Sequence, residues 1–462
     1  MTTQGRRALA PFLLAGLLLA PVAAWADDSP AAEAKGFWER EKLTGDWGGL
    51  RSNLADKGVE LTATYTGETL RNMSGGIRKR TIAAGLLQGD LDIDLEKAIG
   101  WQGGKIHATA FHIHGRQLTS NFIGGLIPVS SIEAAPSTRL FSLWMEQSFL
   151  DDMASVRFGQ VPMQEEFFTS VYAAYMMNSA FGWPAIYAAN LPSGGGGYPL
   201  ANAGVRLKVK PTPEVALMAA VFSGNVAPGT NVGNDAQKRN RSGIEFTADE
   251  PPVWFGEASY SINQDKDSKG LPATFKLGGW YYNGRALDQH YDNTGLSLGN
   301  AATTNIARTH HGNWAVYGIV DHMLWKREGT TDSGVGAFFR TTAMPEDRNQ
   351  MSFWLDTGVT LKGTFEGRDD DITGLSFAYG KMSDELAARD ADARRFATAT
   401  APDHDYEAVI ELMYSYQVTP WWALVGDAQY LFHPGGSATL PTNGAKAIPD
   451  TSVLGLRTVF KL

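Results

Sequence analysis

Seven polar or aromatic residues of this chain are the strongest candidates for binding chemistry. Arginine and glutamate offer charged hydrogen-bonding groups, glutamine offers a donor and an acceptor on one amide, and tryptophan offers a flat apolar face. Such groups can hold a hydroxyl-rich neutral solute reversibly, without making or breaking its bonds. The candidates are Arg116, Trp144, Glu146, Arg157, Gln160, Trp183 and Arg206. No catalytic residue, metal ligand or cofactor is assigned.

Other residue spacings resemble reactive sites, but the sequence around each one argues against that function. Gly295-Leu-Ser-Leu-Gly299 satisfies G-x-S-x-G, but a nucleophile elbow lies between a strand and a helix, and this stretch lies among Asn, Thr and Gly. His112 and His114 share one strand face, yet no third metal ligand can be named. The acidic residues of segment 90–96 lack the central glycine of a calcium loop, and they predict a polar lumen face instead.

The segments around these candidates alternate between apolar and polar residues. From 406 to 418, Ile410 falls on one face of an extended chain and Glu411 on the other. The same period of two recurs in 351–362. From Val59 onward, about 16 or 17 strands of roughly 8 to 13 residues are predicted, joined by Gly, Asn, Asp and Pro clusters.

The composition excludes several classes of protein. The 462 residues contain no Cys, so there is no disulfide framework and no thiolate metal site. A net charge of −9 argues against nucleic acid as a partner. Residues 1–26 combine Arg6-Arg7, an apolar run and Ala24-Trp25-Ala26, which predicts a cleaved secretory signal peptide. No later stretch reaches the roughly 18 apolar residues of a membrane-spanning helix, so any membrane role falls to strands.

Two architectures fit many alternating strands, a soluble sandwich or propeller and a transmembrane barrel. A strand that crosses lipid needs about 9 to 11 residues and carries aromatic rings near its ends. The strands are this long, and the rings of 280–282 and 421–422 are expected at such ends, although they could instead fill an ordinary β core. Segment 454–462 alternates to the last residue, which suits pairing of the last strand with the first. The predicted fold class is all-β, a transmembrane antiparallel β-barrel of about 16 strands.

A series of short motifs resembles one known family. The stretch Leu43-Thr-Gly-Asp-Trp-Gly-Gly-Leu-Arg51 is similar to the start of the mature OprB family of carbohydrate-selective outer-membrane porins. Further similar stretches follow in order at 110–116, 156–160, 190–194 and 239–243. The motif-level similarity spans most of 37–250 and thins toward the C-terminus. The resemblance implies a barrel of about 16 strands, a short N-terminal helix, and passive diffusion of sugars through a lumen narrowed by inward-folded loops.

The domain organisation follows from these features. Residues 1–26 are expected to be the signal peptide, 27–58 an N-terminal periplasmic segment with a short helix, and 59–462 the barrel. Leu50 and Leu54 lie one helical turn apart, and Gly58 suits a helix C-cap.

Two long connections lack alternation. The segment between Gln160 and Ala203 is rich in aromatic residues, and a connection of this length is expected to fold into the lumen as the constriction. Segment 115–138 is a second irregular stretch that could share this role. The alternative is that both are external loops packed on each other.

The alternation also assigns faces to the candidates. If Phe141, Leu143 and Met145 meet lipid, then Trp144 and Glu146 face the lumen. The same parity places Arg157, Arg206 and Lys208 inside. Arg116 and Gln160 come where strands lead into the two long connections, and Trp183 lies within one of them. For each candidate, the alternative is an ion pair that merely ties a loop to the wall.

The expected function is an outer-membrane porin that admits glucose-like monosaccharides by passive diffusion. The protein would be exported to the cell outer membrane of a Gram-negative bacterium and surrounded by lipid there, with a homo-oligomer as one open assembly. Two alternatives stay open, an outer-membrane or periplasmic enzyme that acts on sugars or lipids, and a soluble β sandwich that binds glycans.

Overall fold

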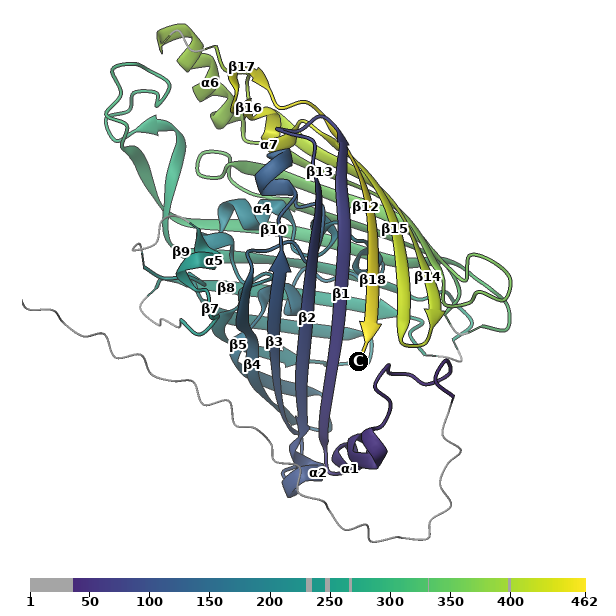
Figure 1. The fold of residues 1–462 in the computed structure, drawn as a ribbon. Coiled ribbons are helices and arrows are strands. Elements are labelled where there is room, and N and C mark those ends of the chain that lie inside the picture. The colour runs from purple at the N-terminus through teal and green to yellow at the C-terminus, as the bar shows by residue number, and fades with distance from the viewer. Residues whose placement is uncertain (1–35, 230–234, 246–249, 266–267, 331, 398–399) are drawn as a thin grey trace, which may run out of the picture. The chain divides into compact units, whose positions relative to one another are not determined.

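Sixteen antiparallel strands close into a barrel (Figure 1). The computed structural model describes residues 36–229, 235–245, 250–265, 268–330, 332–397 and 400–462, so the expected signal peptide lies outside the described residues. Closure is made by the last strand, β18, which pairs with β1 on one side and with β15 on the other. The predicted all-β barrel of about 16 strands is therefore confirmed.

The strands follow one another around the barrel in chain order. The first eight barrel strands are β1 Val59–Ser74, β2 Thr81–Asp94, β3 Gly104–Gly115, β4 Ser137–Phe149, β5 Ala154–Val161, β6 Asn202–Val209, β7 Val215–Ser223 and β8 Pro252–Ile262. The other eight are β9 Ala273–Asp292, β10 Ala307–Lys326, β11 Gly334–Ala343, β12 Met351–Lys362, β13 Ile372–Met382, β14 Tyr406–Thr419, β15 Trp422–Phe432 and β18 Thr451–Lys461. A small separate hairpin consists of β16 Thr439–Leu440 and β17 Asn443–Ala447.

In the part of the chain that the structure describes, helices occur only as short elements before the first strand and between the strands. The α-helices are α1 Leu50–Asp56, α2 Leu95–Ile99, α3 Met163–Glu166, α4 Ala185–Asn190, α5 Ala236–Arg239, α6 Asp384–Ala397 and α7 Pro434–Ser437. Single turns of other helix types are η1 Trp47–Gly49, η2 Thr119–Ile123, η3 Ala173–Tyr175, η4 Ser179–Phe181 and η5 Pro192–Gly194. None of these described helices is long and apolar enough to cross a membrane.

The two rims of the barrel differ in the length of their connections. At one rim, where α1, α2 and the C-terminus lie, the longest connection between strands is 263–272 (Figure 1). The other rim carries the long connections 116–136, 162–201, 224–251 and 383–405. In bacterial barrels the short turns face the periplasm and the long loops face outward.

The short N-terminal helix is present as α1. Its Arg51 donates a hydrogen bond to the backbone carbonyl of Leu462 at 3.1 Å, and the Leu43 amide donates to the Lys461 carbonyl at 2.7 Å. These contacts hold the N-terminal segment against the last strand. At the same rim Asp94, the last residue of β2, caps α2 by accepting from the Glu96 amide at 3.0 Å. The polar strand face predicted for 90–96 therefore ends at Asp94, and Glu96 belongs to α2.

Apolar side chains alternate outward as predicted. On β14, Ile410 and Leu412 are 40% and 53% exposed, while Glu411 between them is fully buried. On β12, Val359 is exposed while Trp354 and Asp356 are buried inside. The outer surface therefore presents the apolar band that a lipid bilayer requires.

The interior contains an extended apolar core as well as polar groups. Aromatic rings of the 162–201 connection pack against inward rings of the wall, with Phe167 4.8 Å from Phe255 and Phe168 5.3 Å from Tyr317 between centroids. Trp280 belongs to this wall and is 3% exposed, so its expected place among the rings at a strand end is wrong. It lies within the 20-residue strand β9 with its side chain inward.

The simple alternation fails at Phe141. The register of β3 and β4 shifts here, because Thr109 pairs with Ser142 and Ala110 with Leu140. Phe141 is thus an extra residue of β4; it is 2% exposed and stacks on Phe111 at 4.7 Å. The expectation that Phe141 meets lipid is wrong because this bulge changes the parity of the strand.

Candidate functional site

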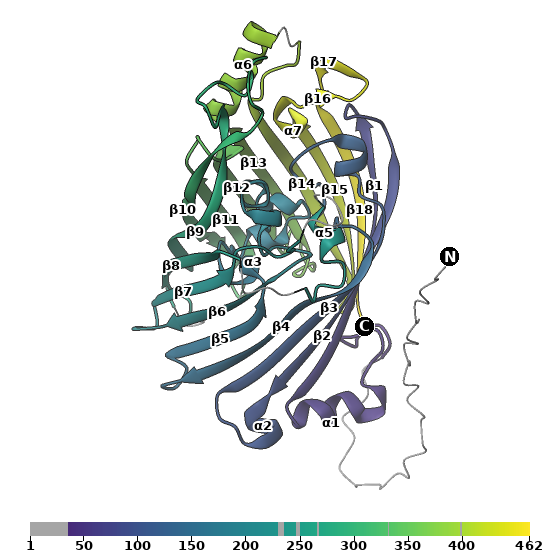
Figure 2. The same ribbon diagram turned by 90° about the vertical axis from the view of Figure 1, so that its left-hand side faces the viewer.

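The connection 162–201 lies inside the barrel, as Figure 2 shows for α3. The inward carboxylate of Glu411 on β14 accepts from the backbone amide of Met177 at 2.6 Å. From β11, Arg340 donates to the carbonyls of Phe168 at 3.1 Å and Ala180 at 3.0 Å. Contacts with inward-facing wall residues on two strands rule out an external loop and agree with the predicted constriction.

The connection 116–136 also folds inward. The carboxylate of Glu407 on β14 accepts from the amides of Leu126 at 2.8 Å and Ile127 at 2.9 Å. The two connections bind each other as well, since the Ser131 amide donates to the Met177 carbonyl at 2.8 Å. Both long connections therefore narrow the lumen together.

A cleft of about 150 Å³ remains between the two connections. Its lining includes Trp183, whose Nε1 donates to the Gly194 carbonyl at 2.9 Å and whose ring lies 5.0 Å from that of Tyr187. Glu133, Gln164 and Tyr198 line the cleft too, and the sequence did not single them out. Glu133 is fixed by the amide and hydroxyl of Thr119 at 2.8 and 2.9 Å.

Glu146, Arg157 and Arg206 form a row across three neighbouring strands. Glu146 on β4 pairs in register with Arg157 on β5, which pairs with Arg206 on β6. Arg157 Nε donates to Glu146 Oε2 at 2.8 Å, and Arg206 Nη2 lies 3.3 Å from Glu146 Oε1. The structure thus brings together three of the predicted residues on one inner face.

Glu166 on α3 completes this group, and sequence reasoning missed it. Its Oε2 accepts from Arg206 Nε at 2.8 Å, and its Oε1 pairs with Arg157 Nη1. Two carboxylates and two guanidinium groups therefore satisfy one another. We call Glu146, Arg157, Glu166 and Arg206 the ion-pair quartet. It ties the start of the inward connection to the wall while placing hydrogen-bonding groups in the lumen.

Trp144 lies beside the quartet between two side chains. The Arg157 guanidinium carbon is 3.6 Å from its ring centroid, and the His107 ring stacks on it at 4.8 Å and 22°. Since β3 and β5 flank β4, these two neighbours approach the indole from its two sides. Asp92 in turn fixes His107 through Nδ1 at 2.7 Å. A solute would have to displace the side chain of Arg157 or His107 to stack on Trp144, whereas Trp183 lines an open cleft.

The family model for carbohydrate-selective porins of the OprB family matches residues 78–462. This chain belongs to that family. Although the motif similarity thins past residue 250, the model match continues to the last residue. Members of the OprB family are channels of the outer membrane of Gram-negative bacteria and not enzymes. Membership therefore decides against the alternatives of an enzyme and a soluble sandwich.

Two relatives resemble this OprB-family chain along most of its length. Porin B of Pseudomonas aeruginosa is 26% identical over 432 residues, which cover 88% of this chain and 90% of that protein. The putative porin QuiX of Acinetobacter baylyi is 22% identical over 454 residues, which cover 92% of this chain and 94% of that protein.

Solved structures of Pseudomonas putida OprB share the fold. A high pH structure matches with a TM-score of 0.81 at 22% identity, covering 93% of this chain and all of that chain. A low pH structure matches with a TM-score of 0.55 at 18% identity, covering 92% and 99%. At this identity the likeness supports the barrel architecture alone.

Two predicted site residues of this OprB-family porin lie apart from the quartet. Gln160 is 3% exposed, and its amide donates to the carbonyls of Phe141 at 2.9 Å and Gly243 at 2.8 Å, so it ties the 224–251 connection to the wall. Arg116 is exposed where β3 leads into the 116–136 connection. Whether a solute contacts Arg116 or Gln160 stays a prediction.

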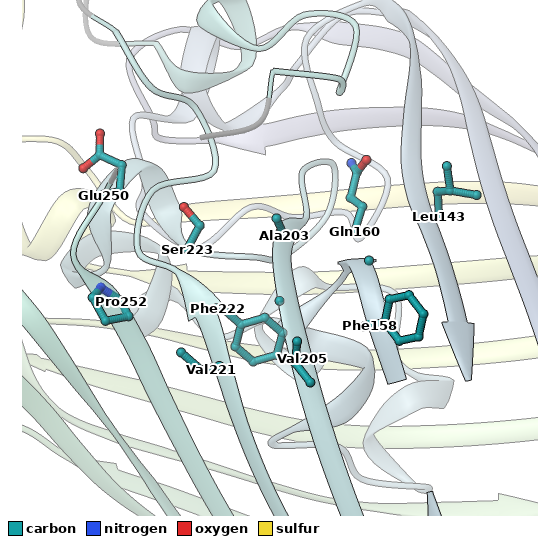
Figure 3. Close-up of a pocket in the computed structure, with 12 residues that line it drawn as sticks. Leu143, Phe158, Gln160, Ala203, Val205, Val221, Phe222, Ser223, Glu250 and Pro252 are labelled. Carbon is teal, nitrogen blue, oxygen red and sulfur yellow. The ribbon is translucent and has the colours of Figure 1, made fainter. Parts of the chain in front are cut away.

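A further hollow lies away from both the cleft and the quartet. It is a groove of about 780 Å³ where the short strands β5 to β7 end (Figure 3). Leu143, Phe158 and Val205 in its lining are exposed on the outward face of the wall. The groove therefore opens toward the lipid and does not belong to the solute path.

Proposed function

We propose that this porin conducts monosaccharides of about glucose size by passive diffusion, through the cleft between the two inward connections and past the ion-pair quartet. The observation that carries this proposal is the pair of long connections that are hydrogen-bonded to the inner wall and to each other, with a cleft of about 150 Å³ between them. A passage of this kind selects solutes by size before it selects by chemistry.

The groups along the path suit a neutral, hydroxyl-rich solute. In the cleft, Trp183 offers an apolar face, and Glu133 and Gln164 offer hydrogen-bonding groups. Nearer the short-turn rim, the quartet offers donors and acceptors whose four charges balance. Such a lining replaces part of the solute's hydration without a deep binding well, which a channel needs for rapid release.

The proposal includes the placement of the chain in the cell. Residues 1–26 would be removed as a signal peptide, and 27–58 would lie in the periplasm with α1. The rim with the short connections would face the periplasm, and α6 and the other long connections would face outward. The apolar outer band would contact outer-membrane lipid, and a homo-oligomer is one possible assembly.

Liposome swelling with the purified full chain tests this function. Glucose should enter and swell the liposomes, a disaccharide should enter more slowly, and a trisaccharide should be excluded. Planar-bilayer recordings on the same sample should show open channels whose ion current glucose reduces. An open channel with no monosaccharide flux would refute the proposal.

A further inference from the structure

Helix α6 docks on the outward end of the β9–β10 hairpin with little apolar contact. In its sequence, Asp-Glu-Leu-Ala-Ala-Arg-Asp-Ala-Asp-Ala-Arg-Arg-Phe-Ala, only Leu386 is buried. Even so, the helix lies close to the connection after β9, since a Cβ on Gly299 would be 2.2 Å from the Arg389 carbonyl oxygen. A polar helix held this closely depends on its ionic contacts.

The central ionic contact is His290, the eighteenth residue of β9. Its Nδ1 lies 2.8 Å from Glu385 Oε2, and its Nε2 lies 2.8 Å from Asp392 Oδ2, both on α6. The imidazole is 8% exposed. A carboxylate only accepts hydrogen bonds, and a neutral imidazole carries a single N–H, so both contacts form together only when the ring carries two protons.

We propose that His290 is a protonation-operated latch, which holds α6 on the β9–β10 hairpin while its imidazole is cationic and releases the helix when the ring becomes neutral. In the neutral ring, one nitrogen lone pair faces a carboxylate oxygen at 2.8 Å, and the contact becomes repulsive. Histidine side chains in general lose this proton near pH 6.5. The latch is therefore closed while the ring carries two protons and open when it carries one.

Further groups on β9 and β10 surround the imidazole of His290. The ring of Tyr291 packs on it at 4.1 Å, and the carboxylate of Asp288 accepts from its backbone amide at 2.9 Å. Asp288 is itself paired with His310 at 2.9 Å and lies 3.9 Å from Arg308, both on β10.

Two of the three α6 carboxylates that contact histidines, Asp390 and Asp392, have a lowered pKa and favour the ionised form. The hydrogen bond from His290 lowers the pKa of Asp392, helped by Ser297 and by the charge of Arg395. Asp390 accepts from His404 Nδ1 at 2.6 Å, a contact that a neutral imidazole can also make. The His404 contact therefore needs only one N–H on its ring, whereas the two contacts of His290 need two.

The latch lies where the outside pH reaches it. A strand needs about 9 to 11 residues to cross a bilayer, and β9 and β10 each have 20. The end of β9 that carries His290 thus extends beyond the long-loop side of the membrane. The proposal is independent of the solute that the barrel conducts.

Hydrogen exchange of the backbone amides of 384–397 tests the latch in the detergent-solubilised full chain. After correction for intrinsic rates, protection should fall roughly tenfold between about pH 5.5 and about pH 8.5. Glu385→Gln should abolish this loss of protection and keep α6 protected at both pH values. The reason is that the glutamine amide can donate a hydrogen bond to the unprotonated nitrogen of a neutral His290 ring. Asp384→Asn is the control on the same helix. It removes a charge that pairs with Lys381, and its protection should still fall between the two pH values.

Two outcomes would overturn the proposal. One is equal protection of 384–397 at both pH values in the unmodified chain. The other is a Glu385→Gln variant with the full pH dependence of the unmodified chain. The side chain of Glu385 is 37% exposed, so this substitution leaves the barrel wall intact. Heat-modifiable gel migration checks that the variants are folded.

Discussion

Glu166 on α3 accepts a hydrogen bond from Nε of Arg206 on β6 at 2.8 Å, while its second oxygen pairs with Arg157 on β5. One carboxylate thus fixes the start of the inward connection to two neighbouring strands. The side chains of Glu166 and Arg206 are 5% and 3% exposed, so the pair is shielded from screening by salt.

Glu166→Gln should widen and loosen the constriction. Removal of one partner from a buried ion pair costs about 3–5 kcal/mol, because the other charges stay buried. The closed barrel persists through its strand pairs, so the cost falls on the position of α3. Single-channel recordings should show higher conductance with more current noise, and liposome swelling should show weaker discrimination between glucose and a disaccharide.

The neighbouring residue supplies a matched control for this prediction. Glu165 is exposed, and Glu165→Gln makes the same substitution at the neighbouring position while the ion pairs of Glu166 stay in place. Its conductance should stay close to that of the unmodified chain. Equal conductance changes in the two variants would show that net charge, and not the anchoring of α3, controls the channel.

Trp183→Ala should weaken the reduction of ion current by glucose. The indole lines the cleft, and an aromatic contact contributes about 0.5–1.5 kcal/mol, which corresponds to roughly a 2- to 10-fold change in apparent affinity. Trp254→Ala is the control, because Trp254 is 49% exposed on the outer face of the barrel. Unchanged glucose affinity in Trp183→Ala would remove Trp183 from the solute path.

Arg340→Met should destabilise the barrel strongly. Arg340 and Asp356 form an almost fully buried ion pair at 2.7 Å, and Arg340 also holds two carbonyls of the inward connection. The expected loss is about 3–5 kcal/mol, because Asp356 is left unpaired. Heat-modifiable gel migration should shift to lower temperature, and the double variant with Asp356→Asn should recover part of the loss.

An exposed pair provides the comparison for Arg340. Arg327 pairs with Asp369 at 3.2 Å, with side chains 30% and 64% exposed. Surface pairs of this kind contribute about 0–1 kcal/mol. Arg327→Met should therefore unfold within a few degrees of the unmodified chain, and a shift as large as that of Arg340→Met would contradict the role assigned to burial.

Alternation alone was sufficient to predict much of the wall. It placed Glu146, Arg157 and Arg206 on one inner face, because side chains of a strand point to opposite sides in turn. It also placed Ile410 outward and Glu411 inward. These predictions needed no tertiary information, since in a closed barrel each strand has one face toward the interior and one face toward lipid.

The parts that alternation could not predict depend on contacts between distant segments. Glu166 lies in a stretch without period, and only the fold of 162–201 brings it to Arg206. The bulge at Phe141 reverses the parity of β4 without a signal in its own sequence. Gly159 pairs with Trp144 and has a φ of 131°, and a Cβ at this position would lie 2.3 Å from the Leu143 carbonyl oxygen. The backbone of β5 therefore departs from regular strand geometry just before Gln160.

Asp371, at the end of the short connection 363–371, should give that turn an acid-sensitive stability. Burial raises the pKa of this carboxyl, but hydrogen bonds from Arg368 at 2.9 Å, from Tyr414 and from the Gln417 amide at 2.8 Å outweigh it and lower the pKa. A carboxyl with a lowered pKa in the folded state stabilises that state above its ordinary pKa, and the contribution is lost as the pH falls through the folded value. Hydrogen exchange of 363–371 should therefore be slow at neutral pH and accelerate only in strong acid.

Asp371→Asn should exchange faster already at neutral pH and lose the acid dependence, whereas the exposed neighbour substitution Asp370→Asn should behave like the unmodified chain. Retention of the full acid dependence in Asp371→Asn would assign it to another group.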